Sequence, residues 1–276
     1  MKKIMIAALT LGTTVSANMA MAADITPEQS RQQFVDYFKA KSPSIEFNEY
    51  GNGVYNYNPD QRMQWQAAEE FPPYLDFIDA GEALWEKDQA VYENCFGKDV
   101  TKVRVMYPRF NEKTQKVETL EGQINQCRTD AKLKPFGWKK GDIANLSAYL
   151  AYQARGQQID VKIESEGAKK AFLDGQAYFS KPRGQFGLAC AECHVYNAGR
   201  RARGNTLGPA LGQTSHVPMY RAKWKELGTL HRRYEGCDKN MRIVPAKVQS
   251  ETYKNLEFFE AYMANGIEIN GPGYRE

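Results

Sequence analysis

The residues best suited to chemistry form one short stretch, Cys190-Ala191-Glu192-Cys193-His194. C-x-x-C-H is the attachment signature of c-type haem, in which two thiols bond covalently to the porphyrin and the histidine binds the iron. The two-residue gap places both sulfurs on one helical turn. We expect Cys190 and Cys193 to hold one covalent haem c, with His194 as the proximal iron ligand.

A zinc site or a redox dithiol could also use this pair of cysteines. Zinc needs further ligands, but the chain has only five Cys and three His, and the others lie far away in sequence. A thioredoxin-like dithiol would need a βαβ context, which the sequence does not show. The motif therefore favours haem, and we expect surface or structural roles for the other two histidines, His216 and His231.

The N-terminal segment, residues 1–22, has the pattern of a secretory signal peptide. Lys2 and Lys3 precede an apolar run, and the segment ends in Ala20-Met21-Ala22, an A-x-A cleavage site. It is too short to span a bilayer as a helix, and no later stretch approaches twenty apolar residues. We expect an exported protein without a membrane span, located in the periplasm, where c-type haem and disulfides form.

Net charge argues against nucleic-acid binding. The formal charge of the whole chain is only +4, and loss of the two signal lysines would lower it by two. The length allows one large or two small domains.

The mature chain should begin with a helix and an irregular extension, residues 23–78. Thr26 is the expected N-cap, Gln29 completes a capping box, and Pro43 should end the helix. Residues 44–74 are rich in Tyr, Asn, Gly and Pro and lack clear periodicity. We expect no regular structure there.

An internal repeat predicts two tandem domains, residues 79–160 and 161–276. When the sequence is aligned with itself at an offset of 110 residues, Thr119 aligns with Thr229 and further identical residues align as well. This is expected for a duplicated unit. Each copy has the helical pattern of a class I cytochrome c, so the predicted fold is mainly α with two tandem class I cytochrome c-like domains. The other matched pairs include Cys127 and Cys237, Pro135 and Pro245, Asn145 and Asn255, and Gly156 and Gly266.

Two helices of the second domain should enclose the haem motif. Gly175 would let them cross closely. Between them, Gly208-Pro209-Ala210-Leu211 is similar to the G-P-x-L segment of class I cytochromes, where the proline carbonyl receives the N–H of the proximal histidine; an ordinary turn is the alternative. The predicted apolar faces are Ala168, Ala171, Phe172, Gly175 and Phe179 in one helix, and Leu256, Phe259 and Met263, closed by Gly266, in the last.

The first domain is expected to be degenerate and haemless. Cys95-Phe96-Gly97-Lys98-Asp99 stands where the second copy has its motif, and neither Lys98 nor Asp99 can replace the second cysteine or the histidine. Cys95 and Cys127 would both lie near the iron in a haem-bearing copy. In an oxidising compartment we expect a disulfide between them, which would stabilise the domain as a covalent cross-link in place of the haem.

Cys237 is then the one unpaired cysteine. In an exported protein a lone cysteine is a reactive thiol, a metal ligand or a link to another chain. It lies 43 residues after His194, where a class I cytochrome supplies its distal ligand. That ligand is usually methionine, so Met241 and Met219 are competitors.

The segment around Cys237 resembles the SoxA family, the larger subunits of the SoxAX cytochromes of bacterial thiosulfate oxidation. The most specific part is Arg232-Arg233-Tyr234-Glu235-Gly236-Cys237-Asp238-Lys239-Asn240-Met241-Arg242, which is similar to the family's active-site segment. Gln64-Trp65 and residues 69–74 are similar too, so the resemblance covers nearly all of the mature chain. Because the first copy lacks a haem motif, the chain resembles the single-haem branch.

This resemblance implies an L-cysteine S-thiosulfotransferase. Cys237 would be the distal iron ligand and the catalytic cysteine, often found as a persulfide, and Arg233 would bind the substrate anion. The family couples thiosulfate oxidatively to a cysteine of the carrier SoxYZ, with electrons leaving through haem and the small cytochrome SoxX as the partner in a heterodimer. The first copy supports the role of Arg233, because Gln123 stands at its place.

A plain electron-transfer cytochrome is the alternative function. It would use His194 and Met241 as axial ligands, with Cys237 a bystander or an intermolecular link. Such a carrier has no need of an arginine and an unpaired cysteine four residues apart, nor of a retained haemless domain. The sequence therefore favours the enzyme.

Overall fold

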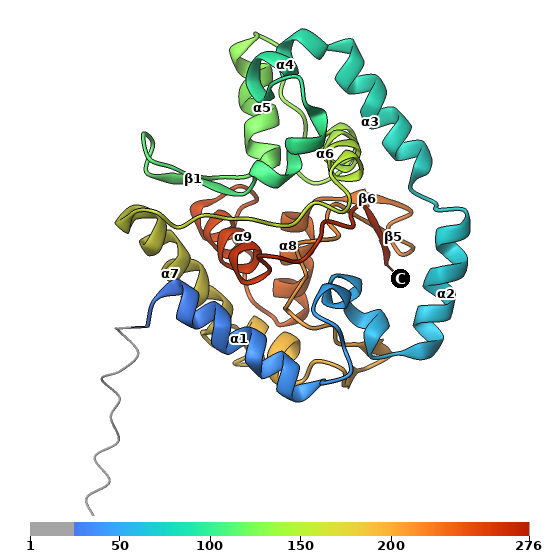
Figure 1. The fold of residues 1–276 in the computed structure, drawn as a ribbon, viewed down its shortest axis with the longest axis vertical. Coiled ribbons are helices and arrows are strands. Elements are labelled where there is room, and N and C mark those ends of the chain that lie inside the picture. Colours follow the sequence, from blue (N-terminus) through green and yellow to red (C-terminus); the bar gives the residue numbers. More distant parts are fainter. Residues whose placement is uncertain (1–24, 276) are drawn as a thin grey trace, which may run out of the picture.

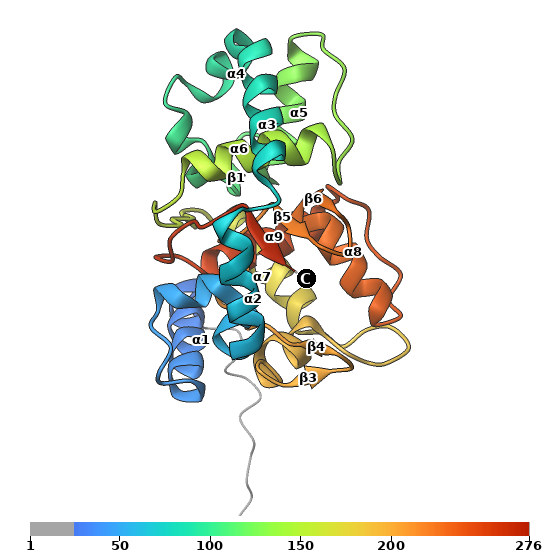
Figure 2. The same cartoon turned by 90° about the vertical axis from the view of Figure 1, so that its right-hand side faces the viewer.

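The structure is a computed structural model that describes residues 25–275, and it is mainly α-helical, as predicted (Figure 1). The predicted signal peptide lies outside these residues. Within the described range, every helix is too short or too polar to cross a bilayer. Figure 2 shows one helical half above and a second half below, with α1 and α2 alongside the lower half.

Helix α1 (Pro27–Lys41) forms as its capping residues predict. The side chain of Thr26 accepts the backbone N–H of Gln29 at 3.2 Å, and the Gln29 side chain accepts the N–H of Thr26 at 2.9 Å. The helix ends at Lys41, whose ammonium donates to the carbonyl of Val195 at 2.7 Å. The first helix is thereby tied to the segment that carries the haem motif.

The predicted irregular extension is wrong in part, because it contains the helix α2 (Pro59–Glu70) as well as the 3-10 segment η2 (Asn48–Asn56). Asn58 caps α2 by accepting the N–H of Gln61 at 3.1 Å. None of the α2 residues is buried, so the helix has no apolar stripe for a periodicity search to find.

The first half is built from four helices and a hairpin. The predicted boundary at residue 79 falls inside its first helix, α3, so the half begins earlier than the sequence repeat indicated. The buried aromatic side chains of Trp85, Tyr92 and Phe96 fill its core. The elements are α3 (Leu75–Lys87), α4 (Gln89–Phe96), η3 (Val100–Lys102), η4 (Arg104–Met106), β1 (Arg109–Asn111), β2 (Lys116–Glu118), α5 (Leu120–Asp130) and α6 (Asp142–Gln153).

The second half adds a small sheet to three longer helices. Strand β5 lies in the middle of this sheet, antiparallel to β6 and parallel to β7. The C-terminal strand therefore returns to the hairpin that precedes α8. The elements are α7 (Glu166–Ser180), η5 (Glu192–Tyr196), β3 (Arg201–Ala202), β4 (Asn205–Thr206), β5 (Met219–Arg221), β6 (Glu226–Gly228), α8 (Leu230–Asn240), α9 (Glu251–Met263) and β7 (Gly273–Arg275).

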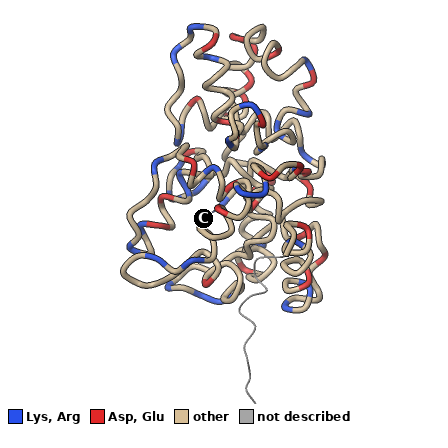
Figure 3. Tube along the Cα trace, turned by 90° about the vertical axis from the view of Figure 1, so that its left-hand side faces the viewer, with Lys and Arg blue, Asp and Glu red and all other residues tan. Residues whose placement is uncertain are grey.

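The two halves repeat the same order of elements at the shift that the sequence predicts. The hairpin and helix β1-β2-α5, at residues 109–130, have the same lengths and spacing as β5-β6-α8, at residues 219–240. In each half this unit is followed by a helix that packs on the first helix of that half: α6 packs on α3, and α9 packs on α7. Figure 3 shows basic and acidic positions interspersed along the trace in both halves.

The close helix crossing predicted at Gly175 is confirmed. A Cβ added there would overlap the backbone carbonyl of Asn255 in α9, and the same relationship joins Gly81 of α3 to Asn145 of α6. The predicted apolar face is confirmed too, because the buried residues of α7 are Ala168, Ala171, Phe172, Gly175 and Phe179.

Candidate functional site

The Cys-x-x-Cys-His stretch lies on a short helical segment after α7, of which η5 is π-helical. The carboxylate of Glu192 accepts the N–H of Ala189 at 2.7 Å, which caps the start of this segment, and η5 continues it. Cys190 and Cys193 are free thiols, each half-buried. The two thiols thus lie about one helical turn apart in the chain, the spacing that the motif requires.

His194 is held by its backbone and by its ring. Its Nδ1 lies 2.9 Å from the carbonyl oxygen of Gly208, and its own carbonyl accepts the N–H of Ala210 at 2.8 Å. The prediction named the carbonyl of Pro209, so the acceptor lies one residue earlier than expected. With Nδ1 engaged by the carbonyl, Nε2 is the ring nitrogen that remains for a metal.

A second polar group also reaches this imidazole. The amide of Gln213 lies 2.7 Å from Nδ1 of His194, a contact that no sequence pattern indicates. Burial lowers the pKa of His194 below its ordinary value, the Gly208 bond partly opposes this, and the charge of Arg233 adds to the lowering. The ring is therefore held neutral, which is the form that binds iron.

Cys237, on α8, shares a site with the haem motif. Burial raises the pKa of Cys190, and the nearby charges of Glu260 and Cys237 raise it further. The pKa of Cys193 is likewise raised by burial and then by Cys237. Cys237 is itself half-buried. Cys237 thus lies within electrostatic range of both motif cysteines, on a helix that starts well after them in the chain.

Arg233 lies one turn before Cys237 on α8, so both side chains project from the same side of the helix. Its charge acts on His194, which places it at the same site. The neighbouring Arg232 is different, because its guanidinium forms an ion pair with Glu226 at 3.0 Å. Within residues 25–275, Arg233 has no ion pair of this kind.

Asp238 anchors the α8 turn that carries Cys237. Its buried carboxylate accepts the hydroxyl of Tyr178 at 2.8 Å and that of Tyr253 at 2.7 Å. Burial and these bonds raise the pKa of both tyrosines, which stay protonated donors. Sequence analysis missed this positioning residue because its partners lie on α7 and α9, far from it in sequence.

A buried carboxylate, Glu260 of α9, faces the same site. It accepts the hydroxyl of Tyr234, and burial raises its pKa to about 7. Its charge interacts with both His194 and Cys237. Sequence analysis did not identify Glu260, because a single Glu within the apolar face of a helix matches no motif.

The two competing methionines are both buried. Met241 follows α8 as its C-cap, and Met219 lies on β5 within the core of the second half. The other histidines are buried as well, so a surface role is wrong for them and a structural one fits. His231 Nε2 lies 3.0 Å from Glu257, and His216 Nδ1 lies 3.2 Å from the Gly51 carbonyl.

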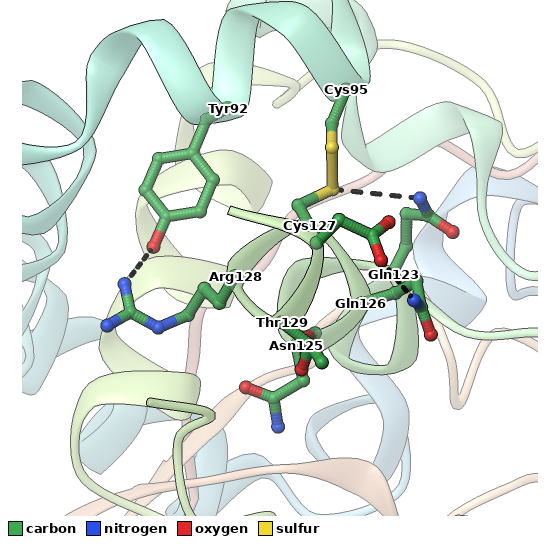
Figure 4. Close-up of a disulfide and its surroundings, with 9 residues drawn as sticks. Tyr92, Cys95, Gln123, Asn125, Gln126, Cys127, Arg128 and Thr129 are labelled. Atoms are coloured by element: carbon green, nitrogen blue, oxygen red, sulfur yellow. Dashed lines mark hydrogen bonds between the residues drawn. A yellow bond between two sulfur atoms is a disulfide. The ribbon is translucent and has the colours of Figure 1, made fainter. Parts of the chain in front are cut away.

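The first half carries a disulfide between Cys95 and Cys127 (Figure 4). The bond joins α4 to α5 across a separation of 32 residues, with the two Cα atoms 6.1 Å apart. Tyr92 of α4 and Arg128 of α5 add a second link beside it, since the guanidinium donates to the phenol oxygen at 2.8 Å. The described residues of this half therefore contain no free thiol.

The donor set around the motif fits a haem c. It consists of two free thiols on one turn and a neutral imidazole with Nδ1 already bonded, which is what covalent attachment and axial ligation require. Among the described residues, no group of three or more His, Cys, Asp or Glu side chains could hold a metal ion on its own. A protein-only zinc site therefore has no support in this part of the chain.

Comparisons with known proteins point to one family. A family model described as SoxA/TsdA, cytochrome c domain, matches residues 80–159. The L-cysteine S-thiosulfotransferase subunit SoxA of Chlorobaculum tepidum is 42% identical over 287 residues, covering 100% of both chains. The protein of the same name from Allochromatium vinosum is 41% identical over 270 residues, covering 96% of this chain and 95% of its own.

A solved structure shares the fold. The crystal structure of SoxXA from P. pantotrophus matches with a TM-score of 0.67 and 27% sequence identity, over 74% of this chain and 79% of that chain. The architecture described above is therefore one already observed in SoxXA.

Proposed function

The chain belongs to the SoxA family of L-cysteine S-thiosulfotransferase subunits, and from this premise we propose that it is the haem c subunit of a periplasmic enzyme that couples thiosulfate oxidatively to a cysteine of a SoxYZ-type sulfur carrier. The observation that carries the proposal is the placement of Cys237 and Arg233 on one side of α8, beside the Cys-x-x-Cys-His turn.

Cys237 is proposed to act as the sulfur nucleophile. Its thiolate and thiosulfate together lose two electrons and form a Cys237–S–S–SO₃⁻ adduct, which contains one new sulfur–sulfur bond. The carrier thiolate then attacks the outer sulfur of this bond, which breaks and returns Cys237 as thiolate. A Cys237 persulfide would react in the same way, with one more sulfur in the chain.

Arg233 is proposed to bind thiosulfate. The substrate is a dianion with three sulfonate oxygens, and a planar guanidinium can hold two of them at once. Placed one turn from Cys237, it would direct the sulfane sulfur of thiosulfate at the thiolate. In the first half the equivalent residue is Gln123, whose side chain carries no charge that could attract an anion.

One haem is proposed, which Cys190 and Cys193 would hold through thioether bonds, and His194 and Cys237 would bind its iron. When bound, this group would supply a one-electron acceptor, so the two electrons of the coupling would leave one at a time through it to the SoxX-type cytochrome. The half with the Cys95–Cys127 disulfide is proposed to be a degenerate cytochrome c-like domain without haem, because it offers neither a motif histidine nor a free thiol among its described residues. The proposed domain division is an extension at residues 23–74, the haemless domain at residues 75–160 and the haem-binding domain at residues 161–276.

The proposed partners follow from the family. A SoxX-type small cytochrome would form the heterodimer and receive electrons, and the likeness to SoxXA from P. pantotrophus supports this. The periplasmic location and removal of a signal peptide at residues 1–22 are proposed from the sequence pattern.

The test is coupling of thiosulfate to the carrier by Cys237→Ala protein loaded with haem. The proposal predicts loss of coupling with retention of the haem. Met241→Leu is the matched control, because it removes the competing ligand from the end of the same helix and keeps a similar volume. Retained coupling in Cys237→Ala would remove Cys237 from the mechanism. Absence of coupling by the native protein, together with a haem spectrum that changes in Met241→Leu and not in Cys237→Ala, would favour the plain electron carrier.

A further inference from the structure

The ring of His194 has two polar neighbours at one atom. Its Nδ1 lies 2.9 Å from the carbonyl oxygen of Gly208 and 2.7 Å from the side-chain amide of Gln213. Sequence analysis predicted one partner for this atom, a backbone carbonyl of the loop that contains Gly208. The proposed function gives the second partner, Gln213, no role.

Contacts on both sides of Gln213 hold it beside the histidine. Gly212 precedes it with a φ of +81°, and a Cβ on Gly212 would lie 2.6 Å from the carbonyl oxygen of Tyr50 in η2, so this position requires glycine. Thr214 follows it, and its carbonyl accepts a hydrogen bond at 3.1 Å from the guanidinium of Arg104. Because Arg104 is a buried residue of η4, the first half holds the loop next to the proximal ligand.

The protonation of the ring decides which atom of the amide must face it. A neutral histidine that binds a metal through its Nε2 carries the hydrogen on Nδ1, so Nδ1 of His194 is then a donor. The amide nitrogen of Gln213, which lies at the contact, is a donor too. Turning the amide by 180° about its last bond puts the acceptor oxygen at the same place. Within residues 25–275 the Gln213 side chain has no other hydrogen bond, so this turn breaks none.

Two acceptors at Nδ1 strengthen the imidazole as a ligand. The N–H of His194 can be shared between the carbonyl of Gly208 and the amide oxygen of Gln213, as in other three-centre bonds. Hydrogen bonds to the outer nitrogen fix the ring of a ligating histidine and raise its basicity. A more basic ligand stabilises ferric over ferrous iron, which lowers the reduction potential.

The first half has no counterpart of this contact. At the offset of 110 residues, which aligns Pro108 with Pro218, Val103 stands at the place of Gln213. Val103 is buried in the core of the first half, and its side chain cannot form a hydrogen bond. The amide is therefore present in the half that carries the Cys-x-x-Cys-His motif and absent from the half that lacks it.

We propose that Gln213 is a positioning residue for the proximal ligand: its side-chain oxygen accepts a second hydrogen bond from Nδ1–H of His194 and lowers the reduction potential of the haem. The inference rests on the proposed function in one respect, that His194 binds the haem iron. Gln213 thereby sets the balance between uptake of an electron at the site and its release to the partner cytochrome.

Spectroelectrochemical titration of the haem-loaded full chain tests this without turnover. Gln213→Leu removes the acceptor, and we expect reduction to become about tenfold more favourable, a rise in midpoint potential of about 59 mV for one electron. Gln213→Glu supplies a charged, stronger acceptor and should shift the potential in the opposite direction. The matched control is Gln176→Leu, which removes a hydrogen bond of 2.9 Å to Ser30 and should leave the potential unchanged.

The outcomes separate this inference from the proposed function. A native potential in Gln213→Leu, an effect equal to that of Gln176→Leu, or shifts of the same sign in both Gln213 variants would overturn the role of Gln213 and leave the coupling function untouched. A full chain that takes up no haem would overturn the proposed ligand set, and retained coupling by Cys237→Ala would overturn the proposed mechanism alone. The absorption spectrum of covalent haem, retained in each variant, shows that the variant has folded.

Discussion

The side-chain amide of Gln123 donates to the sulfur of Cys127 at 3.6 Å, one turn later on α5 (Figure 4). On α8, Arg233 and Cys237 occupy the two equivalent positions of the second half. The first half thus shows directly that a side chain at this spacing reaches the sulfur. In the proposed function, the guanidinium of Arg233 at this position would bind the substrate anion beside Cys237.

Arg233→Lys should impair thiosulfate use while leaving the haem environment intact. Lysine keeps the charge but loses the planar, two-point contact, so we expect the KM for thiosulfate to rise about tenfold or more. Steady-state coupling kinetics and the absorption spectrum are the measurements. Arg201→Lys, at an exposed position on β3, is the control. An unchanged KM in Arg233→Lys would remove Arg233 from substrate binding.

Asp238→Ala should destabilise the protein strongly. It leaves the hydroxyls of half-buried Tyr178 and buried Tyr253 without their charged acceptor, which we expect to lower the free energy of unfolding by on the order of 3 kcal/mol. Urea denaturation measures this. Asp174→Ala, which breaks an exposed pair with Lys170, should change it by less than about 0.5 kcal/mol. Similar values for the two variants would mean that Asp238 does not anchor α8.

Gly175→Ala should disturb the crossing of α7 and α9. The added Cβ would overlap the Asn255 carbonyl, and the backbones would have to separate at a cost of about 1–3 kcal/mol. Gly137→Ala is a matched control, since a Cβ there meets no atom within 4 Å. The measurement is the thermal unfolding temperature of the two variants, which we expect to be lower for Gly175→Ala. A Gly175→Ala protein as stable as Gly137→Ala would contradict the close crossing.

The disulfide should appear as one linked peptide pair containing Cys95 and Cys127 after non-reducing digestion. Replacing both cysteines by alanine opens a loop of 32 residues and should lower the free energy of unfolding by about 3–4 kcal/mol. Intact mass of the same sample should show one haem. Finding both residues as free thiols, or a mass increase of two haems, would contradict a haemless first half.

The sequence alone was sufficient where a pattern is local or repeated. The buried face of α7 and the capping box of α1 were predicted residue by residue, because helical periodicity and caps depend only on near neighbours. The internal repeat likewise predicted matching elements in the two halves. The Cys-x-x-Cys-His motif carries its own spacing, so it located the candidate haem site without a structure.

What the sequence missed depends on contacts between distant segments. Helix α2 has caps but no buried face, so periodicity could not reveal it. Asp238 gains its role from tyrosines on two other helices. Likewise, the acceptor of the His194 ring is the carbonyl of Gly208, and only the loop's path selects it over that of Pro209.

Electron paramagnetic resonance of the ferric, haem-loaded protein tests the central claim most directly, by comparing the native chain with Cys237→Ala. The account predicts a low-spin signal typical of thiolate ligation that disappears in the variant, because Cys237 lies beside the motif and shares its site. A signal typical of histidine and methionine ligation that Cys237→Ala leaves unchanged would contradict it. The chain would then be an electron carrier that uses Met241.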